Sequence, residues 1–488
     1  MINLLEVAER IRTGQKMDTK SYDMGLFRKT QELTKKYNLN QPGKPEFWEV
    51  DNAYADAVFQ AGVDFLTEWG AYCVTTERVI KFTEDEVRRA AREIPSQIVV
   101  GEGSDTRTIK KREIEDTQNR PNIVVAGHSA WSDEVPVPIH IAVREMVSDE
   151  RVDVIQGYMY AETDKYEISG PTHWAYAARR AVERVRNGCT QAGRPGLCVV
   201  QYPTLTRAFA LVAAMDPYRG LRPTDGTMFS IQPDLHVDAD YVAASYVYEE
   251  YGLAYKENQG GGSNFIADIY GGMIISIASR LAAWMCYRDN VQGGGGAAEP
   301  RGAQRDWGGV APASELVAER AKKYDAMWLN FAVYKALHRN TGLITKANIW
   351  GCHEMAVEQL SDEFLLMQAI SAMRETLWGN HFHFAGSANP PTVIRWPIDV
   401  SDAVMRSKLK LSDYQELSSR ITREKLQGWQ DLSRVKDQRM KAYESPKQLL
   451  DTQLNVYDFF KQKISEKYLE NEKKVRSYLK DLGLDFRA

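Results

Sequence analysis

The chain has 488 residues, of which 43% are hydrophobic and 26% charged, a composition that predicts a folded protein and excludes a disordered chain. Its 62 Lys and Arg residues against 66 Asp and Glu give a formal net charge of −4. This balance provides no global basic field for nucleic acid or an anionic membrane. A chain of this length predicts roughly three ordinary domains or one large barrel of roughly 250 residues with extensions.

The cysteine usage predicts a reduced, cytoplasmic protein. The five cysteines are an odd number, lie far apart and form no CxxC pair. Residues 1–16 mix Glu and Arg into a short apolar stretch, so we expect no signal peptide. The longest apolar segment, residues 272–286, is interrupted by Arg280, which predicts a buried helix rather than a membrane span.

Residues 1–120 are expected to form an extension of helices with one or two hairpins. Within it, Thr83 lies three residues before Glu86. This spacing is a capping box, in which each side chain satisfies a backbone amide at the start of a helix.

From about residue 121 the pattern changes, because short apolar runs alternate with longer helical patterns such as 172–185, 239–251, 271–287 and 354–377. Eight such units predict a (β/α)8 TIM barrel over residues 121–400. The sixth run is the weakest, because it leads into a glycine-rich stretch at 292–309 that we expect to be a loop. Residues 401–488 are expected to form charged helices. The candidate strands are 123–127, 152–159, 196–202, 227–232, 253–257, 290–294, 343–348 and 381–386.

The active site of a TIM barrel lies at the carboxyl ends of its strands, so the polar and aromatic residues there are the candidate site. These residues are rich in amides and aromatic rings and poor in Lys and Arg. Such a rim suits a small neutral or cationic ligand better than a phosphorylated one. The candidates are His128, Trp131, Gln156, Tyr158, Gln201, Tyr202, Gln232, Tyr255, Glu257, His381 and His383.

Glu257 is the carboxylate of greatest interest among them. It shares a strand face with Tyr255, because side chains two residues apart on a strand point the same way. Two interpretations remain open for it. Glu257 either pairs with an Arg or a helix amide, or it serves as counter-ion or proton acceptor for an ammonium substrate.

His381 and His383 also share a face, and Cys352 with His353 is predicted to open the helix after the seventh strand. This set allows a zinc site, although no compact ligand motif is present and paired strand histidines are more often hydrogen-bonded barrel residues. We therefore predict no metal. The glycine clusters lack the spacing of nucleotide-binding loops, and neither GxSxG nor HExxH occurs.

Five sequence blocks resemble the monomethylamine:corrinoid methyltransferases of methylotrophic methanogens, in order through much of residues 20–290. They are AGVDFLTEWGAYCVTTERVIKFTEDEV (61–87), IVVGEGSDTRTIKKREI (98–114), DEVPVPIH (133–140), VDVIQGYM (152–159) and NGCTQAGRPGLCVVQYP (187–203). The resemblance implies a TIM-barrel enzyme that delivers the methyl group of methylamine to the cobalt of a separate corrinoid protein docked over the barrel mouth. It also implies that the corrinoid is carried by that partner and that the enzyme is a homo-oligomer.

The chain departs from this family at its distinguishing residue, a pyrrolysine on the strand after AGRPG that captures the amine. Alignment on Pro203 puts Gln201 at that position and alignment on Val199 puts Val200 there; neither can form an imine-like adduct. Glu257 matches a family active-site glutamate, whereas the family's Gln and Tyr after the seventh strand correspond to residues within 344–346. The resemblance thus implies a homologue without pyrrolysine, and sequencing the gene distinguishes an encoded Gln201 from one inserted at an amber codon.

Without pyrrolysine, a methylamine is a poor methyl donor, whereas a quaternary ammonium needs no further activation. In the related trimethylamine family, homologues without pyrrolysine resemble demethylases of quaternary amines such as glycine betaine. We therefore expect methyl transfer from an N-methylated amine to Co(I), with catalytic roles for Glu257 and Gln201 and an aromatic box from the nearby tyrosines and Trp131. The alternatives are zinc-assisted methyl transfer from an alcohol or thiol, and a noncatalytic relative that binds an amine or a corrinoid protein.

Overall fold

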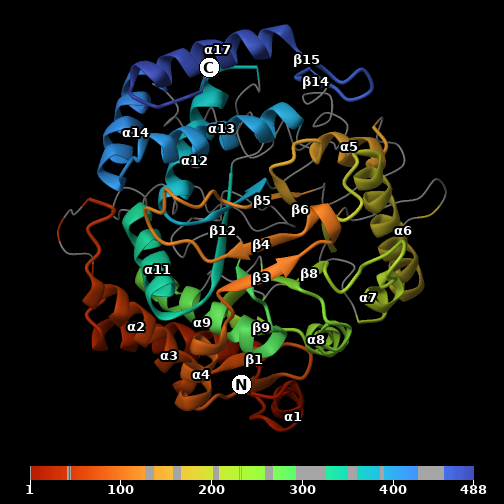
Figure 1. The fold of residues 1–488 in the computed structure, drawn as a ribbon. Helices are drawn as coiled ribbons and strands as arrows, with labels where there is room; N and C mark the ends of the chain where they lie inside the picture. Colours follow the sequence, from red (N-terminus) through yellow and green to blue (C-terminus); the bar gives the residue numbers. More distant parts are fainter. Residues whose placement is uncertain are drawn as a thin grey trace. The chain divides into compact units, whose positions relative to one another are not determined.

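The computed structural model of the chain is shown with its helices and strands in Figure 1. It describes residues 2–40, 43, 46–126, 137–157, 166, 168–201, 208–229, 231, 233–258, 267–292, 326–349, 360–384, 390–426 and 455–487. Statements about the structure below refer to these ranges.

Eight strands form a closed barrel in the order β10-β11-β12-β13-β5-β6-β7-β8. Each of the eight strands expected from the sequence is present, including the sixth, β11, which has two residues. The predicted (β/α)8 class is therefore confirmed. The strands are β5 (Ile123–Ala126), β6 (Val152–Gln156), β7 (Cys198–Gln201), β8 (Gly226–Phe229), β10 (Tyr255–Asn258), β11 (Val291–Gln292), β12 (Ile344–Asn348) and β13 (His381–Phe384).

The chain divides into two compact units, each assembled from three chain segments. Unit 1 consists of Met1–Gln97, Met228–Tyr251 and Lys256–Ile344. Unit 2 consists of Ile98–Thr227, Gly252–Tyr255 and Thr345–Ala488. Within unit 2, parallel pairing runs from β12 through β13, β5, β6 and β7 to the first residues of β8, with a register shift between Ile123 and Val124 where β5 pairs with β6. The predicted division of the chain into three domains, residues 1–120, 121–400 and 401–488, stays a prediction.

Unit 1 is built around the apolar helix α9, which packs against α2, α3 and α4. From Gly271 to Tyr287 each residue of α9 is buried, so the prediction of a buried helix is confirmed. Although α9 is long and apolar enough to cross a membrane, 89% of its apolar window lies inside the protein. The helices of unit 1 are α1 (Leu4–Thr13), α2 (Thr19–Lys36), α3 (Asn52–Glu68), α4 (Glu84–Glu93), α8 (Ala239–Tyr251), α9 (Ile269–Tyr287) and α11 (Ala326–Asn340).

The start of α4 has the predicted capping box. Thr83 Oγ1 accepts a hydrogen bond from the Glu86 amide, and the Glu86 carboxylate accepts one from the Thr83 amide at 2.9 Å. Glu86 also binds the Arg10 guanidinium, which joins α4 to α1. A small sheet in the order β2-β1-β9 completes this unit, with strands β1 (Ala71–Cys73), β2 (Arg78–Ile80) and β9 (His236–Val237) and a short 3-10 helix, η3 (Pro233–Leu235).

Unit 2 combines the barrel strands named above with two groups of helices. Helix α6 packs against α5 and α7, and α12 packs against α13, α14 and α17. The helices are α5 (Ile139–Met146), α6 (Gly170–Gln191), α7 (Ala208–Ala214), α12 (Asp362–Leu377), α13 (Pro391–Ser407), α14 (Leu411–Lys425) and α17 (Glu466–Asp481). The remaining elements are a two-stranded sheet of β3 (Gln97–Val100, which begins in unit 1) and β4 (Arg107–Lys110), the 3-10 helix η1 (Gly103–Asp105), and the paired strands β14 (Tyr457–Asp458) and β15 (Lys463–Ile464).

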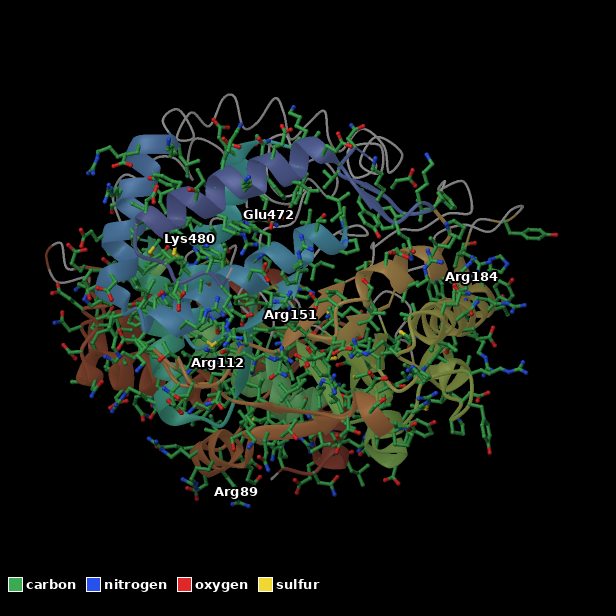
Figure 2. All side chains as sticks on the ribbon, turned by 45° about the horizontal axis from the view of Figure 1, so that its top comes forward. Arg89, Arg112, Arg151, Arg184, Glu472 and Lys480 are labelled. Atoms are coloured by element: carbon green, nitrogen blue, oxygen red, sulfur yellow. The ribbon has the colours of Figure 1, made fainter. Side chains whose placement is uncertain are left out.

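The charged C-terminal helices are joined to the rest of unit 2 by a chain of ion pairs. Arg151, which precedes β6, binds Asp399 of α13 at 2.8 Å. Arg476 of α17 binds the same Asp399 and Glu472, each at 2.8 Å. Figure 2 labels Arg151 and Glu472 at the two ends of this chain of contacts. The basic residues of this region are thus partly used for internal packing rather than presented only to solvent.

The four cysteines in the described ranges, Cys73, Cys189, Cys198 and Cys286, are buried and form no disulfide. Burial raises the pKa of Cys189 to about 12, so its thiol is not a ready nucleophile.

Candidate active site

One hydrogen bond identifies the inner face of the barrel strands in unit 2. His383 Nε2 on β13 lies 2.8 Å from Gln156 Oε1 on β6, and β5 runs between these two strands. A bond that spans an intervening strand forms on the concave side of a barrel. The opposite face meets the helices, since a Cβ added at Gly157 would lie 3.8 Å from Val185 of α6.

His383 is a neutral hydrogen-bond donor at this inner face. Its side chain is fully buried, and burial followed by the charge of Lys346 holds the pKa of the imidazole well below its usual range. Because the amide oxygen of Gln156 can only accept, His383 carries its proton on Nε2 and donates it to Gln156. The two predicted site residues Gln156 and His383 are thus brought together as a rigid polar pair.

Lys346 lies on the same face, although it was absent from the candidates chosen by sequence. In the pairing of β12 with β13, Lys346 is opposite His381 and Asn348 is opposite His383. Partners in a parallel ladder point to one side of the sheet, and residues two apart do so as well, so Lys346 shares the face of His383. Its side chain is 1% exposed. The available signal was a single charged residue in a strand whose other residues are uncharged.

The pairing register of β7 shows which of the two residues that alignment offers for the pyrrolysine position, Val200 or Gln201, points into the barrel. Val200 is opposite Gln156 and therefore shares the inner face, whereas Gln201 points to the other side of β7 together with its partner Thr227. Gln201 is 3% exposed, and neither atom of its amide has a hydrogen-bond partner among the described residues. The strand geometry thus favours Val200 as the residue that faces the inside of the barrel.

Glu257 points away from the helices of unit 1. Its neighbour Lys256 binds Glu249 of α8 and lies 5.7 Å from the ring centre of Tyr248 on the same helix. Successive strand residues alternate, so Glu257 projects to the opposite, inner face, and Tyr255 shares that face. Both side chains are fully buried. Glu257 is thus a buried carboxylate that points to the inside of the barrel.

His381 has a structural role, in contrast to His383. Its Nδ1 accepts a hydrogen bond from the Asn122 amide at 2.9 Å, and its Nε2 donates to the Lys110 carbonyl at 2.8 Å. Backbone groups thus bind both ring nitrogens, and the substrate contact expected of His381 stays a prediction.

Asp289 is a further buried acid in unit 1, and it was absent from the candidates chosen by sequence. It is 2% exposed, and neither carboxylate oxygen has a hydrogen-bond partner among the described residues. Burial raises the pKa of Asp289 well above its usual range. The charge of Lys256 lowers this pKa and the charge of Glu257 raises it further. A buried acid without donors is more stable protonated, so Asp289 adds an uncharged acid near Glu257.

Several predicted residues lie outside the described ranges, namely His128, Trp131, Tyr158, Tyr202, Gln232, Cys352 and His353. Within the described ranges, no three His, Cys, Asp or Glu side chains gather as a metal site would require. The zinc alternative therefore has no ligand set among these residues.

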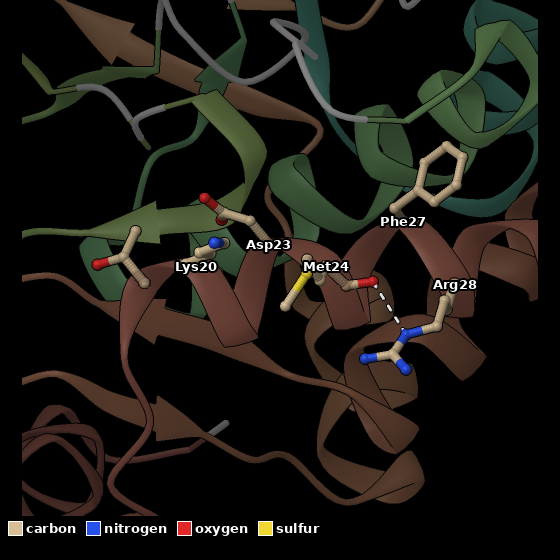
Figure 3. Close-up of a pocket in the computed structure, with 6 residues that line it drawn as sticks. Lys20, Asp23, Met24, Phe27 and Arg28 are labelled. Carbon is tan, nitrogen blue, oxygen red and sulfur yellow. Dashed lines mark hydrogen bonds between the residues drawn. The ribbon is translucent and has the colours of Figure 1, made fainter.

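One hollow in the described part of the chain lies in unit 1, along one face of α2. Its volume is about 780 Å³, and its described lining consists of Thr19, Lys20, Asp23, Met24, Phe27 and Arg28. Figure 3 shows these side chains on a single helix, with the Arg28 guanidinium bonded to the Met24 carbonyl. One helix face offers no convergent polar groups, so we assign this hollow no role.

The strand order and the polar side chains on the inner strand faces define a (β/α)8 barrel of the class that binds a small molecule at the carboxyl ends of its strands. The family described as monomethylamine methyltransferase MtmB matches residues 2–295, which is more than half of the chain. The chain therefore belongs to this family.

Individual relatives agree with this assignment. The chain is 30% identical over 239 residues to a monomethylamine methyltransferase of Methanosarcina acetivorans, covering 48% of this chain and 50% of that protein. It is 29% identical over 293 residues to one of Methanosarcina mazei, covering 57% and 60%. The chain thus matches about half the length of these curated relatives.

Solved structures extend the likeness in fold to nearly the full chain. The crystal structure of the Methanosarcina barkeri monomethylamine methyltransferase superposes with a TM-score of 0.75 at 20% identity, covering 99% of this chain and 98% of that one. A crystal structure of the hydroxylamine complex of that type of enzyme gives the same values. At this identity the likeness shows the fold alone.

Proposed function

We propose that the chain is a corrinoid-dependent methyltransferase without pyrrolysine. It moves a methyl group from an N-methylated amine, quaternary or otherwise activated, to Co(I) of a cognate corrinoid protein. The observation that carries the proposal is the family membership combined with a fully buried Glu257 on the inner face of β10. The corrinoid, carried by the partner, is the methyl acceptor, and the electron pair of the broken C–N bond stays on the departing amine.

In this proposal Glu257 is the counter-ion of the substrate cation. A carboxylate inside a barrel attracts a positive charge more strongly than one in water, because the local dielectric constant is low. It stabilises the bound ammonium, and Tyr255 on the same face adds an aromatic surface for the methyl groups. The departing amine is neutral, so Glu257 could accept a proton only from a donor that still carries an N–H.

The pair of Gln156 and His383 orients the substrate. The bond between them fixes both side chains, so a ligand meets a preorganised polar wall and loses little entropy on orientation. Val200 is opposite Gln156 in the strand pairing. It is one of the two positions, with Gln201, that alignment offers for the family's pyrrolysine, and neither side chain can form an adduct. We therefore propose that the substrate is held noncovalently. His128, Trp131, Tyr158, Tyr202 and Gln232 stay predicted contacts at the barrel mouth.

The proposal is tested by following Co(I) spectrally, with the corrinoid protein encoded nearest this gene and a panel of methylated amines. Methylation with at least one donor is expected, and no methylation with any of them overturns the proposal. Glu257→Gln removes the counter-ion, for which we expect a rate about 10- to 100-fold lower, the effect of losing about 1.5–3 kcal/mol of charge-assisted binding. The matched control is Glu249→Gln, since Glu249 pairs with Lys256 on the helix side of the same strand.

The methylation assay and the Glu257→Gln variant also test the alternatives to this proposal. A noncatalytic relative would retain binding of the corrinoid protein and show no methylation by the unmodified chain. Unchanged turnover in Glu257→Gln would refute the role of this carboxylate. We also propose that the protein is cytoplasmic and forms a homo-oligomer. Size-exclusion chromatography with light scattering tests the oligomeric state.

A further inference from the structure

Helices α6 and α7 present apolar side chains to solvent. The two helices pack side by side within unit 2 (Figure 1). The ring of Phe209 at the start of α7 stacks on Trp174 of α6, with ring centres 6.4 Å apart. Large apolar side chains that gather on one surface, rather than lying singly, mark an interaction site. Four such side chains on these helices and just after them are between 42% and 86% exposed, namely Tyr176, Phe209, Val212 and Tyr218.

Arginine side chains lie among these apolar groups and connect them. The guanidinium carbon of Arg180 lies 5.5 Å from the ring centre of Tyr176, and Arg180 also binds Glu183 at 3.1 Å. Arg179 binds the same Glu183 at 2.8 Å and Asp216, two residues before Tyr218, at 2.7 Å. The contacts thus join the outer side of α6 to the segment after α7.

We call the exposed and half-buried side chains of residues 176–184 and 209–219 the α6–α7 surface. Its charged residues are four arginines, at 179, 180, 184 and 219, and two acids, at 183 and 216, so its formal net charge is +2. The guanidinium of Arg219 is exposed and has no carboxylate partner among the described residues. Tyrosine and arginine are the residues that most often dominate the energetics of protein interfaces.

Helix α8 in unit 1 has the opposite charge. Its 13 residues include Asp240, Glu249 and Glu250 and no Lys, Arg or His, which gives a formal charge of −3. All three acidic residues are exposed. Glu249 binds Lys256, whereas Glu250 has no cationic partner among the described residues. The chain therefore carries a basic aromatic surface in one unit and an acidic helix in the other, which are complementary in charge.

We propose that copies of this protein assemble by placing the α6–α7 surface of one copy against α8 of another. This inference rests on the proposed homo-oligomeric state and names the two surfaces that form it. The apolar side chains occupy the centre of the contact, and the arginines face the carboxylates of α8 around it. Each copy has both surfaces, so the contact repeats from copy to copy until the assembly closes.

Charge reversal on each surface, followed by analytical ultracentrifugation of the whole chain at pH 7, tests the pairing. The first variant combines Arg180→Glu with Arg219→Glu, and the second combines Asp240→Lys with Glu250→Lys. In either variant the two surfaces carry like charges, so the dissociation constant should rise at least about 100-fold. The chain with all four substitutions has opposite charges again, and it should assemble as the unmodified chain does. Lys473→Glu on the exposed side of α17 is the matched control and should change nothing.

Tyr218→Ser tests the apolar part of the contact without a change of charge. It should raise the dissociation constant about 10- to 100-fold. Phe460→Ser is its control, because Phe460 is 58% exposed between β14 and β15, away from both surfaces in sequence, and the assembly should be unchanged. If a charge-reversal variant does not fold by circular dichroism, the comparison of Tyr218→Ser with Phe460→Ser decides.

The outcomes separate this inference from the state on which it rests. A chain that is monomeric at every concentration would refute the homo-oligomer and the inference together. An oligomer that persists in both charge-reversal variants would refute the inference and leave the homo-oligomer standing. Dissociation that the four substitutions together do not reverse would refute the pairing of these two surfaces. Methyl transfer is tested separately by the spectral assay.

Discussion

Loss of one partner of a buried ion pair at the amino end of the barrel strands is expected to destabilise unit 2. Asp225 precedes β8 and is 1% exposed. It binds the guanidinium of Arg186 on α6 and accepts hydrogen bonds from the Val199 amide at 2.8 Å and the Arg222 amide at 2.7 Å. One carboxylate therefore joins α6, the start of β7 and the turn before β8.

Replacement of Asp225 by Asn keeps the shape but leaves the Arg186 charge buried, since Arg186 is 5% exposed. Burial raises the pKa of Asp225 even beside Arg186, so for this carboxylate desolvation outweighs the attraction of the guanidinium. The cost of the variant thus comes from the uncompensated cation, and we expect a loss of about 3–5 kcal/mol in the free energy of unfolding. Removal of both charges in Arg186→Met with Asp225→Leu should restore much of this loss.

Urea unfolding followed by tryptophan fluorescence and circular dichroism measures these differences at pH 7. The control is Glu9→Gln, since Glu9 pairs with Arg12 on an exposed surface where the side chains are 54% and 73% exposed. That variant should change the free energy of unfolding by less than about 0.5 kcal/mol. A loss below about 1 kcal/mol in Asp225→Asn, or a double variant less stable than the single one, would refute the reasoning about an uncompensated buried charge.

Two further predictions concern α4 and α6. The guanidinium of Arg10 lowers the pKa of Glu86 from 4.5 to about 2, so its ion pair contributes stability above about pH 4.5 that is lost as the pH falls towards 2. Glu86→Gln preserves the capping box. In urea unfolding it should cost about 1 kcal/mol at pH 7 and progressively less as the pH falls from 4.5 towards 2. A cost independent of pH would contradict this. Gly188→Ala would place a Cβ 2.6 Å from Val143 Cβ and 2.7 Å from the His140 carbonyl oxygen, for which we expect a loss of about 1–3 kcal/mol. The exposed neighbouring change Asn187→Ala is the control for thermal unfolding, and equal melting temperatures for the two variants would argue against close packing of α5 and α6.

The sequence by itself determined the features that depend on local pattern. Strands buried on both faces appear as short apolar runs, so all eight barrel strands could be placed, and even the two-residue β11 was found from its position in the alternation. The capping box of Thr83 and Glu86 and the burial of α9 follow from residues within one or two turns of each other. The family assignment likewise depends on contiguous blocks.

The tertiary structure decided which face each residue presents and what it meets there. Two histidines two residues apart on β13 differ in role, because His381 is held by the backbone and His383 by Gln156 on a strand more than 200 residues away in sequence. The strand register, which depends on pairing between distant segments, placed Val200 rather than Gln201 on the inner face. It also turned Lys346 inward. A one-residue shift reverses the face of a strand residue, so these assignments required the pairing partners, which the local sequence does not contain.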